Sequence, residues 1–392
     1  MKLLLLADIP PCRNYTGGLV LAEQCRLLPR GSVSGFIVLN PLLKPELFTD
    51  LAHLPLEIAD KPSEHGEWEH GLDGAIAAER HKATVLRDEL VARAVAFGRR
   101  EKVTAVWAML EGQTIVRMAL PVAQALGVPL CTQVWDPLSW WLREHKVDPV
   151  NAAEATVQFD ATLRASRACA TASWNMAEHY RKTYGIRSVP LISGFAESSG
   201  RRPPLHLHRA DEVTIGMIGQ FYASDAWEAL ISVLDRENWR IGERTVRIYY
   251  LGAALAADSH FRNLVHGGWL SPTDAIDALS CNADILYCPY PFRRDMAEVA
   301  RMSFPSKLVM YAAAGRPILC HAPYDSSPAC YLDRNGAGAV VNTLDGRSVF
   351  EMIRWMVGDL SVYARFAAAA QQAFRADFTH ATMARNVEAF LS

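Results

Sequence analysis

The chain has 392 residues, of which 50% are hydrophobic, and its 40 basic and 42 acidic residues give a formal net charge of −2. This length favours two domains of similar size, and the apolar content suffices for two hydrophobic cores. A net charge so close to zero excludes a global attraction to nucleic acid or to an anionic membrane, so any polyanion must be bound at a local site. We therefore expect no nucleic-acid partner.

The cysteines and the first residues indicate the compartment. None of the 8 cysteines forms a C-x-x-C pair, and several lie in apolar runs, which is typical of reduced core residues in a cytosolic protein. The first run, MKLLLLA, meets Asp8 too early for a signal peptide, and no apolar run reaches membrane-spanning length. We expect a cytoplasmic protein. The aromatic and basic segment 140–143 leaves open a peripheral contact with the inner face of the membrane.

A first series of alternating segments occupies the N-terminal half of the chain. Strands are predicted at 3–7, 33–39, 104–110, 129–134, 168–172 and 189–192, and helices at 19–28, 75–98 and 114–126. Such alternation predicts a parallel sheet wrapped by helices, whose ligands gather beyond the carboxyl ends of the strands. Gly17-Gly18, Glu111 and Trp135-Asp136 hold that position, and we expect them to converge on one site.

Two polar stretches stand out in the chain, one within this first series and one after it. Residues 60–71 contain two Glu-His pairs without the spacing of a metal site, so we expect an exposed loop and no bound metal. Residues 196–212 are rich in Ser, Gly, Arg, Pro and His, a composition typical of a linker. We therefore assign residues 1–196 to an N-terminal domain, 197–212 to a linker, 213–375 to a C-terminal domain and 376–392 to a helix that crosses back to the first domain.

A second series of segments follows the linker. Strands are predicted at 213–218, 246–251, 284–288, 318–320 and 339–341, and helices at 348–356, 362–374 and 381–391. The segment 302–317, MSFPSKLVMYAAAGRP, predicts a further helix. We expect Ser303 to cap this helix, Pro305 to lie in its first turn and Gly315 to end it.

The start of that helix is a candidate anion site. Helix starts carry unpaired N–H groups and the positive end of the helix dipole, and Ser306 and Lys307 lie in the first turn. The alternative is an ordinary core helix whose lysine is solvated. The chain contains no G-x-G-x-x-G, P-loop, H-E-x-x-H or G-x-S-x-G motif, which removes the main support for a dehydrogenase, an NTPase, a zinc protease or a serine hydrolase.

The same segment carries a resemblance to a known family. Residues 304–319, FPSKLVMYAAAGRPIL, are similar to the S-K-x-x-E-Y-x-A-A-G-x-P-V motif of glycosyltransferase family 4, whose members have the GT-B fold. Shorter matches extend over most of the chain, namely Gly17-Gly18, Val134-Trp135-Asp136 for V-H-D, Ala172-Ser173 for V-S, Ser193-Gly194-Phe195 for P-N-G and 283–289 for A-D-V-x-x-x-P. The resemblance implies an α/β protein with the GT-B fold, in which two Rossmann-like doubly wound domains face each other across a cleft.

The resemblance also implies a function. The C-terminal domain would bind a nucleoside diphosphate sugar, and its sugar would be transferred to a glycan, lipid-linked or small-molecule acceptor bound by the N-terminal domain, as in polysaccharide biosynthesis. Family members retain the anomeric configuration and need no metal, and no other cofactor is expected. Without a metal, helix starts and cationic side chains must meet the charge of the leaving group.

Individual residues are assigned on this basis. The donor diphosphate is expected at Gly17, Gly18, Ser306, Lys307, Arg293 and Arg294, and the nucleoside at Gly219, Gln220, Phe221, Trp269 and Leu270. Lys307 and Asp136 are the expected catalytic residues, and Trp135, Asp136 and Glu111 are expected to bind the acceptor or the transferred sugar. For Asp136, the alternative is that it only caps a helix starting at Pro137.

The chain departs from the family at several positions. Met302 and Met310 occupy the positions of the Glu-x7-Glu pair, and a methionine cannot accept hydrogen bonds from ribose hydroxyls as a carboxylate does. No Lys or Arg stands where a basic pair is expected after the first strand of the C-terminal domain, and Trp135 replaces a histidine. Two alternatives therefore remain, a non-catalytic GT-B protein that binds a glycan or a glycosyltransferase partner, and a nucleotide-sugar epimerase.

Overall fold

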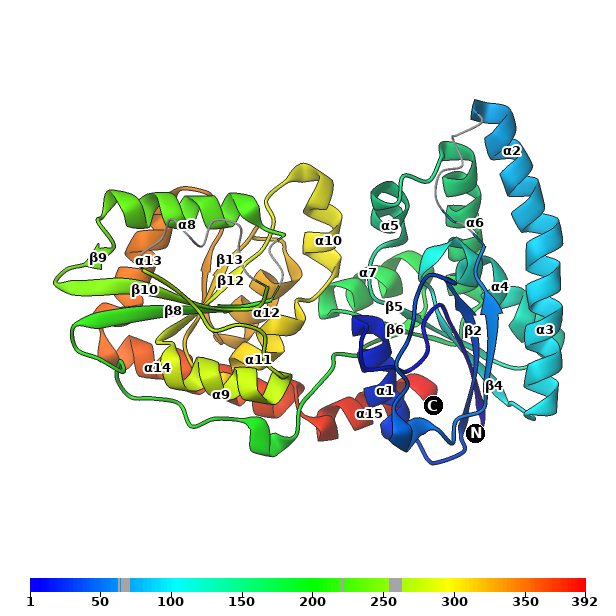
Figure 1. Ribbon diagram of the computed structural model, residues 1–392, viewed down its shortest axis with the longest axis horizontal. Helices are drawn as coiled ribbons and strands as arrows, with labels where there is room; N and C mark the ends of the chain where they lie inside the picture. Colours follow the sequence, from blue (N-terminus) through cyan, green and yellow to red (C-terminus); the bar gives the residue numbers. More distant parts are fainter. Residues whose placement is uncertain (63, 65–70, 220–221, 254–262) are drawn as a thin grey trace. The chain divides into compact units, whose positions relative to one another are not determined.

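A computed structural model describes residues 1–62, 64, 71–219, 222–253 and 263–392 (Figure 1). The chain divides into two compact units, one formed by Met1–Ile192 with Ala384–Ser392 and the other by Ser193–Met383. Residues 197–212, expected to be a linker, are therefore part of the second unit. Backbone pairing explains this difference, because the N–H of Arg201 donates to the carbonyl of Ala313 at 2.7 Å and Leu207 is buried in the core.

The sheet of the first unit is parallel throughout its described strands. Its strand order is β3 (Leu56–Asp60), β2 (Val33–Leu39), β1 (Leu3–Ala7), β4 (Ala105–Met109), β5 (Leu130–Val134), β6 (Ala168–Thr171) and β7 (Arg187–Pro190). The central strands β1, β2, β4 and β5 are buried along their whole length, as expected where helices cover both faces of a sheet. The strand order reverses at β1: strands β2 and β3 lie on one side of it, and β4 to β7 lie on the other.

The helices of the first unit connect these strands. They are α1 (Thr16–Arg26), η1 (Thr49–Leu51), α2 (Gly71–His81), η3 (Lys82–Leu86), α3 (Arg87–Arg100), α4 (Gly112–Leu126), α5 (Leu138–Glu144), α6 (Pro149–Ala165) and α7 (Trp174–Tyr184). The helix α15 (His380–Leu391) adds a last element, and its Phe390 packs against Trp107 of β4 with ring centroids 6.5 Å apart. Helices α3, α4 and α6 lie side by side on one face of the sheet.

The second unit repeats the design. Its parallel strands run in the order β11 (Leu264–His266), β10 (Arg244–Leu251), β8 (Glu212–Ile218), β12 (Ile285–Pro289), β13 (Ile318–His321) and β14 (Ala339–Val341), with β9 (Arg240–Ile241) antiparallel to β10. Figure 1 shows α8 (Ser224–Arg236) and α13 (Gly346–Gly358) on one face, and α9 (Pro272–Asn282), α11 (Ser306–Ala314) and α14 (Leu360–Asp377) on the other. The shorter elements are η4 (Glu197–Ser199), η6 (Arg294–Met296), α10 (Ala297–Met302) and α12 (Ser327–Asn335).

The helix predicted around 302–317 is divided in the structure. Helix α10 ends at Met302, and Ser303 is extended with φ −84° and ψ 156°. Pro305 then holds the N-cap position of α11 with ψ 120°, so the predictions that Ser303 caps this helix and that Pro305 lies in its first turn are wrong. Pro305 disfavours helical backbone at Phe304, the residue before it, so one continuous helix cannot run through this point. Gly315 ends α11 in the left-handed region at φ 66°, as predicted.

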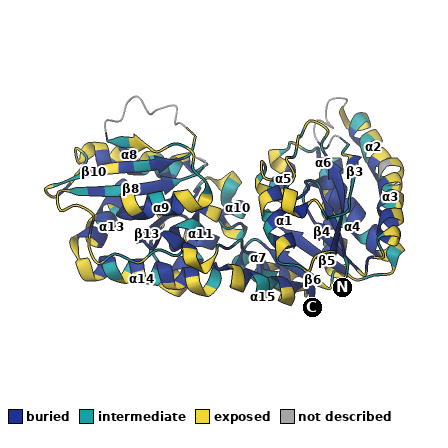
Figure 2. Ribbon diagram, turned by 60° about the horizontal axis from the view of Figure 1, so that its bottom comes forward, coloured by how far each residue is buried: buried dark blue, intermediate teal, exposed yellow. Residues whose placement is uncertain are grey.

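The distribution of buried residues follows these layers. Figure 2 shows the central strands of both sheets largely buried and the outward faces of the surrounding helices exposed. Within the described residues, every helix is too short or too polar to cross a lipid bilayer.

Candidate functional site

The carboxyl edge of the second sheet holds a buried lysine. Lys307 lies in the first turn of α11 and is only 7% exposed. Its Cε atom lies 3.8 Å from the position that a Cβ would take on Gly219, the residue that follows β8 with φ +97°. Its Nζ atom lies 5.0 Å from the centre of the Tyr222 ring. The amine therefore reaches the end of β8, next to the point where the strand order of this sheet reverses, which is where doubly wound sheets bind ligands.

The surroundings of Lys307 supply aromatic surface and no counter-ion. The Tyr222 ring packs edge-on against Tyr290 at a centroid distance of 5.7 Å, and the hydroxyl of Tyr290 donates to the carbonyl of Ser303 at 3.1 Å. Among the described residues, no carboxylate forms an ion pair with Lys307. Burial lowers the pKa of its amine. A buried cation that lacks a carboxylate is the arrangement expected where an anionic ligand completes the site.

The other residues expected to bind the donor are distributed around this sheet. Arg293 is exposed and pairs with Asp295 at 3.1 Å between Nε and Oδ1, and the exposed Arg294 begins η6. Ser306, the first residue of α11, is exposed. The predicted nucleoside residues Gln220 and Phe221 lie outside the described residues.

The loop after β11 reaches the same edge of the sheet. Trp269 is 80% exposed, and Leu270 after it is half-buried. The N–H of Gly252, which follows β10, donates to the carbonyl of Gly268 at 2.9 Å. The N–H of Gly219 donates to the carbonyl of Leu251 at 3.0 Å. The ends of β8, β10 and β11 are thus joined by backbone hydrogen bonds beside an exposed indole.

In the first unit, the carboxyl edge is acidic. Lys61 follows β3, and its Nζ lies 2.8 Å from Oε2 of Glu64 and 3.4 Å from Oδ2 of Asp8, which follows β1. The other oxygen of Glu64 accepts hydrogen bonds from the N–H and the hydroxyl of Thr114, at 2.5 and 2.6 Å, and so caps the start of α4. A Cβ on Gly112 would lie 2.5 Å from Glu64, and the φ of +72° at this residue also favours glycine.

Glu111 and Asp136 meet at this edge, as the sequence predicts. They line one small pocket together with Leu110, Gly112, Leu138 and Trp141. Burial, followed by the negative charges of Asp8 and Asp136, raises the pKa of Glu111 to about 8 against the opposing charge of Lys61. Glu111 therefore holds a proton at neutral pH. Burial and then the charge of Glu64 also raise the pKa of Asp8, although Lys61 opposes them.

Close packing explains the two glycines of α1. A Cβ on Gly17 would lie 2.8 Å from Cζ3 of Trp135, and one on Gly18 would lie 2.2 Å from the Sγ of Cys12. The backbone of Gly17 therefore packs directly against the ring of Trp135, the residue expected to line the sugar site. Pro137, rather than Asp136, holds the N-cap position of α5.

Full-length similarity to solved glycosyltransferase structures identifies the fold. HepE from Anabaena in complex with UDP matches with a TM-score of 0.67 and 16% identity, covering 100% of this chain and 99% of that chain. Sucrose-phosphate synthase from Thermosynechococcus elongatus matches at 0.68 and 10%, covering 100% and 98%. The lipopolysaccharide outer core galactosyltransferase WaaB matches at 0.64 and 10%, covering 100% and 99%. The chain has the GT-B fold. No protein-family model and no curated protein sequence matches it.

This GT-B protein lacks carboxylates at the positions of the family's Glu-x7-Glu pair. Met302 is the last residue of α10 and Met310 lies within α11, and both are half-buried. Met310 follows Lys307 by three residues, a spacing that places the two side chains on the same side of a helix. The side of α11 that carries the lysine therefore presents a thioether where the family has a hydrogen-bond acceptor.

Sequence reasoning missed the network that shapes the first edge. Asp8 and Thr114 are far in the chain from the neighbouring pair Lys61 and Glu64, and only the fold brings them together. Glycine at position 112, directly after a predicted strand, was the available signal of a close approach. Among the described residues, no group of three His, Cys, Asp or Glu side chains could hold a metal ion.

Proposed function

We propose that the chain is a glycosyltransferase that moves a sugar from a nucleoside diphosphate sugar to a glycan, lipid-linked or small-molecule acceptor. The observation that carries this proposal is Lys307, a buried cation at a helix start with no carboxylate partner among the described residues. The GT-B fold agrees with it, since HepE has been solved with UDP and with UDP-glucose and WaaB is a galactosyltransferase.

In the second unit, the diphosphate would lie at the start of α11. The Lys307 ammonium and the N–H groups of the first turn, including that of Ser306, would stabilise its charge as the sugar leaves. Arg293 and Arg294 would add positive charge nearby, and the exposed Trp269 would stack on the base. Because these groups are all part of the protein, the proposed reaction needs no metal and no other cofactor.

In the first unit, Trp135, Glu111 and Asp136 would bind the acceptor or the transferred sugar. Glu111 carries a proton at neutral pH, since its pKa is about 8, and it would donate a hydrogen bond to a sugar oxygen. Asp136 would orient the acceptor hydroxyl and accept its proton. In line with the family, the configuration at the anomeric carbon would be retained. We propose that this chemistry takes place in the cytoplasm or at the inner face of the membrane, in polysaccharide biosynthesis.

Binding of UDP to wild type and to Lys307→Ala, measured by titration calorimetry, tests the proposal. Loss of a buried charge-assisted contact should weaken binding by about 2 kcal/mol, roughly thirtyfold in Kd. With an active donor and acceptor pair, turnover should fall by about two to three orders of magnitude. Lys182→Ala is the matched control, because Lys182 is 73% exposed and pairs with Glu178.

The outcome separates this function from the alternatives. If wild type bound none of UDP, GDP, ADP and dTDP or their sugars, the chain would be a non-catalytic GT-B protein, in line with the methionines at 302 and 310. If a nucleotide sugar were converted without an acceptor, the epimerase would be favoured. Wild-type turnover in Lys307→Ala would refute the role of the lysine.

A further inference from the structure

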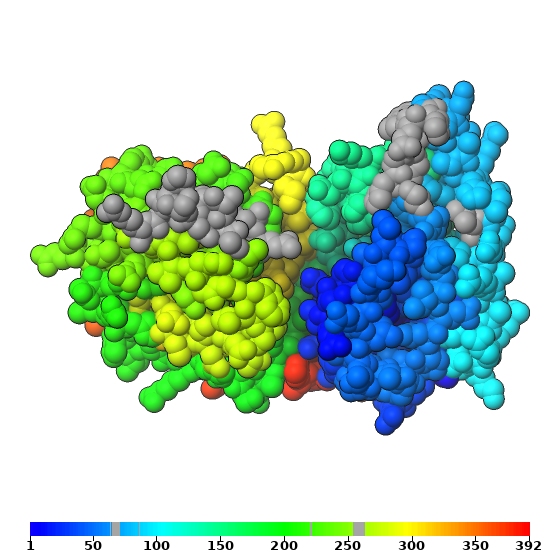
Figure 3. All heavy atoms as spheres, viewed as in Figure 1, coloured from blue at the N-terminus to red at the C-terminus, as the bar shows by residue number. Residues whose placement is uncertain are grey.

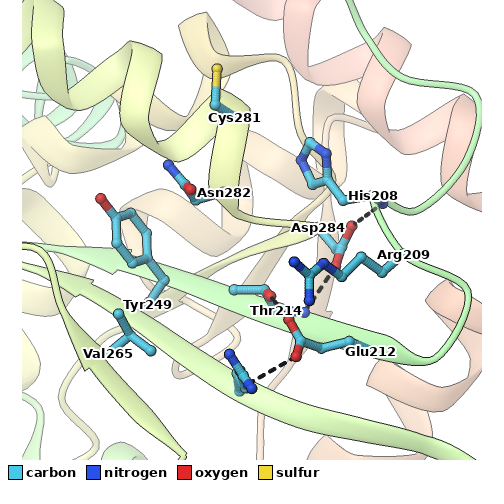
Figure 4. Close-up of a pocket in the computed structure, with 10 residues that line it drawn as sticks. His208, Arg209, Glu212, Thr214, Tyr249, Val265, Cys281, Asn282 and Asp284 are labelled. Atoms are coloured by element: carbon cyan, nitrogen blue, oxygen red, sulfur yellow. Dashed lines mark hydrogen bonds and ion pairs between the residues drawn. The ribbon is translucent and has the colours of Figure 1, made fainter.

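A second cavity lies at the amino edge of the second sheet, at the other end of the strands from Lys307. It has a volume of about 290 Å³, and Figure 4 shows the side chains around it. The start of β8, the middle of β10, strand β11 and the end of α9 form one part of its wall. His208 and Arg209 form another, and both come from the segment expected to be a linker. This cavity lies wholly within the second unit.

Asp284 fixes this wall in place. The side chain is buried, and its two oxygens accept hydrogen bonds from the N–H groups of His208 and Thr214, both at 2.8 Å. The dashed lines in Figure 4 mark these bonds. The carboxylate therefore holds the 208–209 segment against the start of β8. Because its hydrogen bonds are made to the protein, Asp284 acts as part of the scaffold rather than as a ligand-binding group.

Next to this wall, one guanidinium group of the cavity has no carboxylate partner among the described residues. Figure 4 shows this guanidinium, that of Arg209, extending toward Thr214. Arg247 is paired with Glu212 at 2.8 Å. Behind the wall, Arg316 is 7% exposed, and its Nε and Nη1 atoms have no hydrogen-bond partner among the described residues.

Arg316 lies close enough to act on the cavity. Its third nitrogen donates to the carbonyl of Ser280, directly before Cys281, which lines the cavity. Burial and then the charge of Arg316 lower the pKa of His208, while Asp284 opposes them. Arg209 and Arg316, which have no carboxylate partner among the described residues, therefore lie near His208, whose lowered pKa favours the neutral ring. Such a cavity favours an anion.

The opposite side of the cavity is neutral and suited to hydroxyl groups. Tyr249 of β10 and Asn282 at the end of α9 face it in Figure 4, above the apolar Val265. Burial raises the pKa of Tyr249, so its hydroxyl remains a neutral donor and acceptor. The Asn282 amide nitrogen donates to the carbonyl of Ala278 at 2.8 Å, which directs the side chain. Hydroxyl and amide groups bind sugar hydroxyls, and a cavity of this size fits a ligand smaller than a typical drug.

We propose that this cavity binds a phosphorylated monosaccharide, with the phosphate at Arg209 and the sugar ring between Tyr249 and Asn282. The site is separate from the donor site, since the β8 residues that line it, Glu212 and Thr214, lie at the opposite end of this strand from Gly219. A GT-B protein would thereby sense a sugar phosphate independently of its nucleotide. This inference does not depend on the proposed transfer reaction.

Cys281 allows a direct test, because it is exposed and is one of the residues that line the cavity. It lies in α9, which forms part of the yellow-green surface in Figure 3. Alkylation of the full chain by iodoacetamide is followed peptide by peptide by mass spectrometry, with glucose 6-phosphate as the probe. At ten times its dissociation constant, the probe should slow alkylation of Cys281 roughly tenfold by mass action. The half-buried Cys330 of α12 is the internal reference and should react at an unchanged rate.

Variants and related probes decide the outcome. Arg209→Ala should abolish the protection, whereas Arg334→Ala, at an exposed arginine of α12, should keep it. Lys307→Ala should also keep it, and UDP should give none, so failure of the donor site would not be confused with failure of this one. Equal protection by inorganic phosphate or by glucose would overturn the proposed ligand. Absence of protection by glucose 6-phosphate, or protection that survives Arg209→Ala, would overturn the site.

Discussion

The two units share one sheet design, yet their carboxyl edges carry opposite charge. In the first unit, Asp8, Glu64 and Glu111 gather around Lys61. In the second, Lys307 has no carboxylate partner among the described residues. Since the backbone arrangement is repeated, the difference comes from the side chains that follow the strands. The fold fixes where a ligand binds, and these side chains decide its charge.

Burial favours the neutral form of an ionisable side chain at both carboxyl edges. It raises the pKa of Glu111 and lowers that of Lys307, so both groups are shifted toward their neutral forms. For Lys307, a bound anion would favour the charged form, because the ion pair would offset the cost of burial. For Glu111, the retained proton makes the carboxyl a donor. The second edge thus suits a diphosphate and the first suits a hydroxylated acceptor.

Loss of Lys61 is the largest expected perturbation of the acidic edge. Lys61→Met would leave Glu64, whose side chain is 2% exposed, without its counter-ion. Breaking a buried pair in this way costs about 3–5 kcal/mol, which urea unfolding would measure. Lys182→Met removes an exposed pair and should cost at most about 1 kcal/mol. Equal losses in the two variants would mean that the edge is not the buried network described above.

The proton on Glu111 predicts an unusual pH dependence. Its pKa rises from 4.5 to about 8 on folding, so the folded protein holds a proton that the unfolded chain releases. The stability contributed by this group is therefore present at low pH and is lost as the pH rises from about 5 to 8. Relative to Glu111→Gln, wild type should lose on the order of 3 kcal/mol between these limits in urea unfolding. Parallel curves would contradict the raised pKa, and the exposed Glu197→Gln is the control.

A carboxylate at position 310 would test whether the ribose of the donor lies beside Lys307 at the cationic edge. Met310→Glu supplies the acceptor that ribose hydroxyls meet in the family, on the same side of α11 as Lys307. We expect UDP to bind about tenfold more tightly, a gain of about 1.4 kcal/mol in calorimetry. The gain should be smaller with 2′-deoxy-UDP and absent in Met310→Leu. Weaker binding in Met310→Glu would place the ribose elsewhere.

The smallest expected effect concerns the exposed indole of this edge. If Trp269 stacks on the base, UDP should quench tryptophan fluorescence, and Trp269→Leu should remove the quench and weaken binding by about 1 kcal/mol. Stability should change by less than about 0.5 kcal/mol, because the side chain is 80% exposed. Trp355→Leu, at another exposed tryptophan, should leave the quench unchanged. A quench that persists in Trp269→Leu would exclude the stacking role.

Much of the fold could be predicted from the sequence because its central strands are continuous apolar runs. Strands β1 and β2 have the predicted bounds for this reason. Strands β3 and β11 were missed because they are short, partly exposed elements without a continuous apolar run. The caps of α6 and α7, Asp148 and Ser173, were readable signals that were not used.

For the candidate site, positions directly after strands were predictable and long-range pairing was not. Glu111 and Asp136 meet in one pocket because the carboxyl ends of parallel strands share an edge. The position of Lys307 in the first turn of a helix could be predicted from the sequence. Its contact with Tyr222 could not be predicted. The pairing of Lys61 with Asp8 joins residues that follow two different strands, which no periodic pattern in the sequence specifies.

The discontinuity of the first unit has a consequence for synthesis on the ribosome. Residues 384–392 belong to this unit, and Phe390 packs against the buried Trp107. The unit that leaves the ribosome first therefore cannot close its core until the second unit has been made. A nascent chain arrested before residue 384 would expose the surface around Trp107, where chaperones could bind. The first unit is thus the first to begin synthesis and the last to have all of its residues, whereas the second unit is complete once residue 383 has been made.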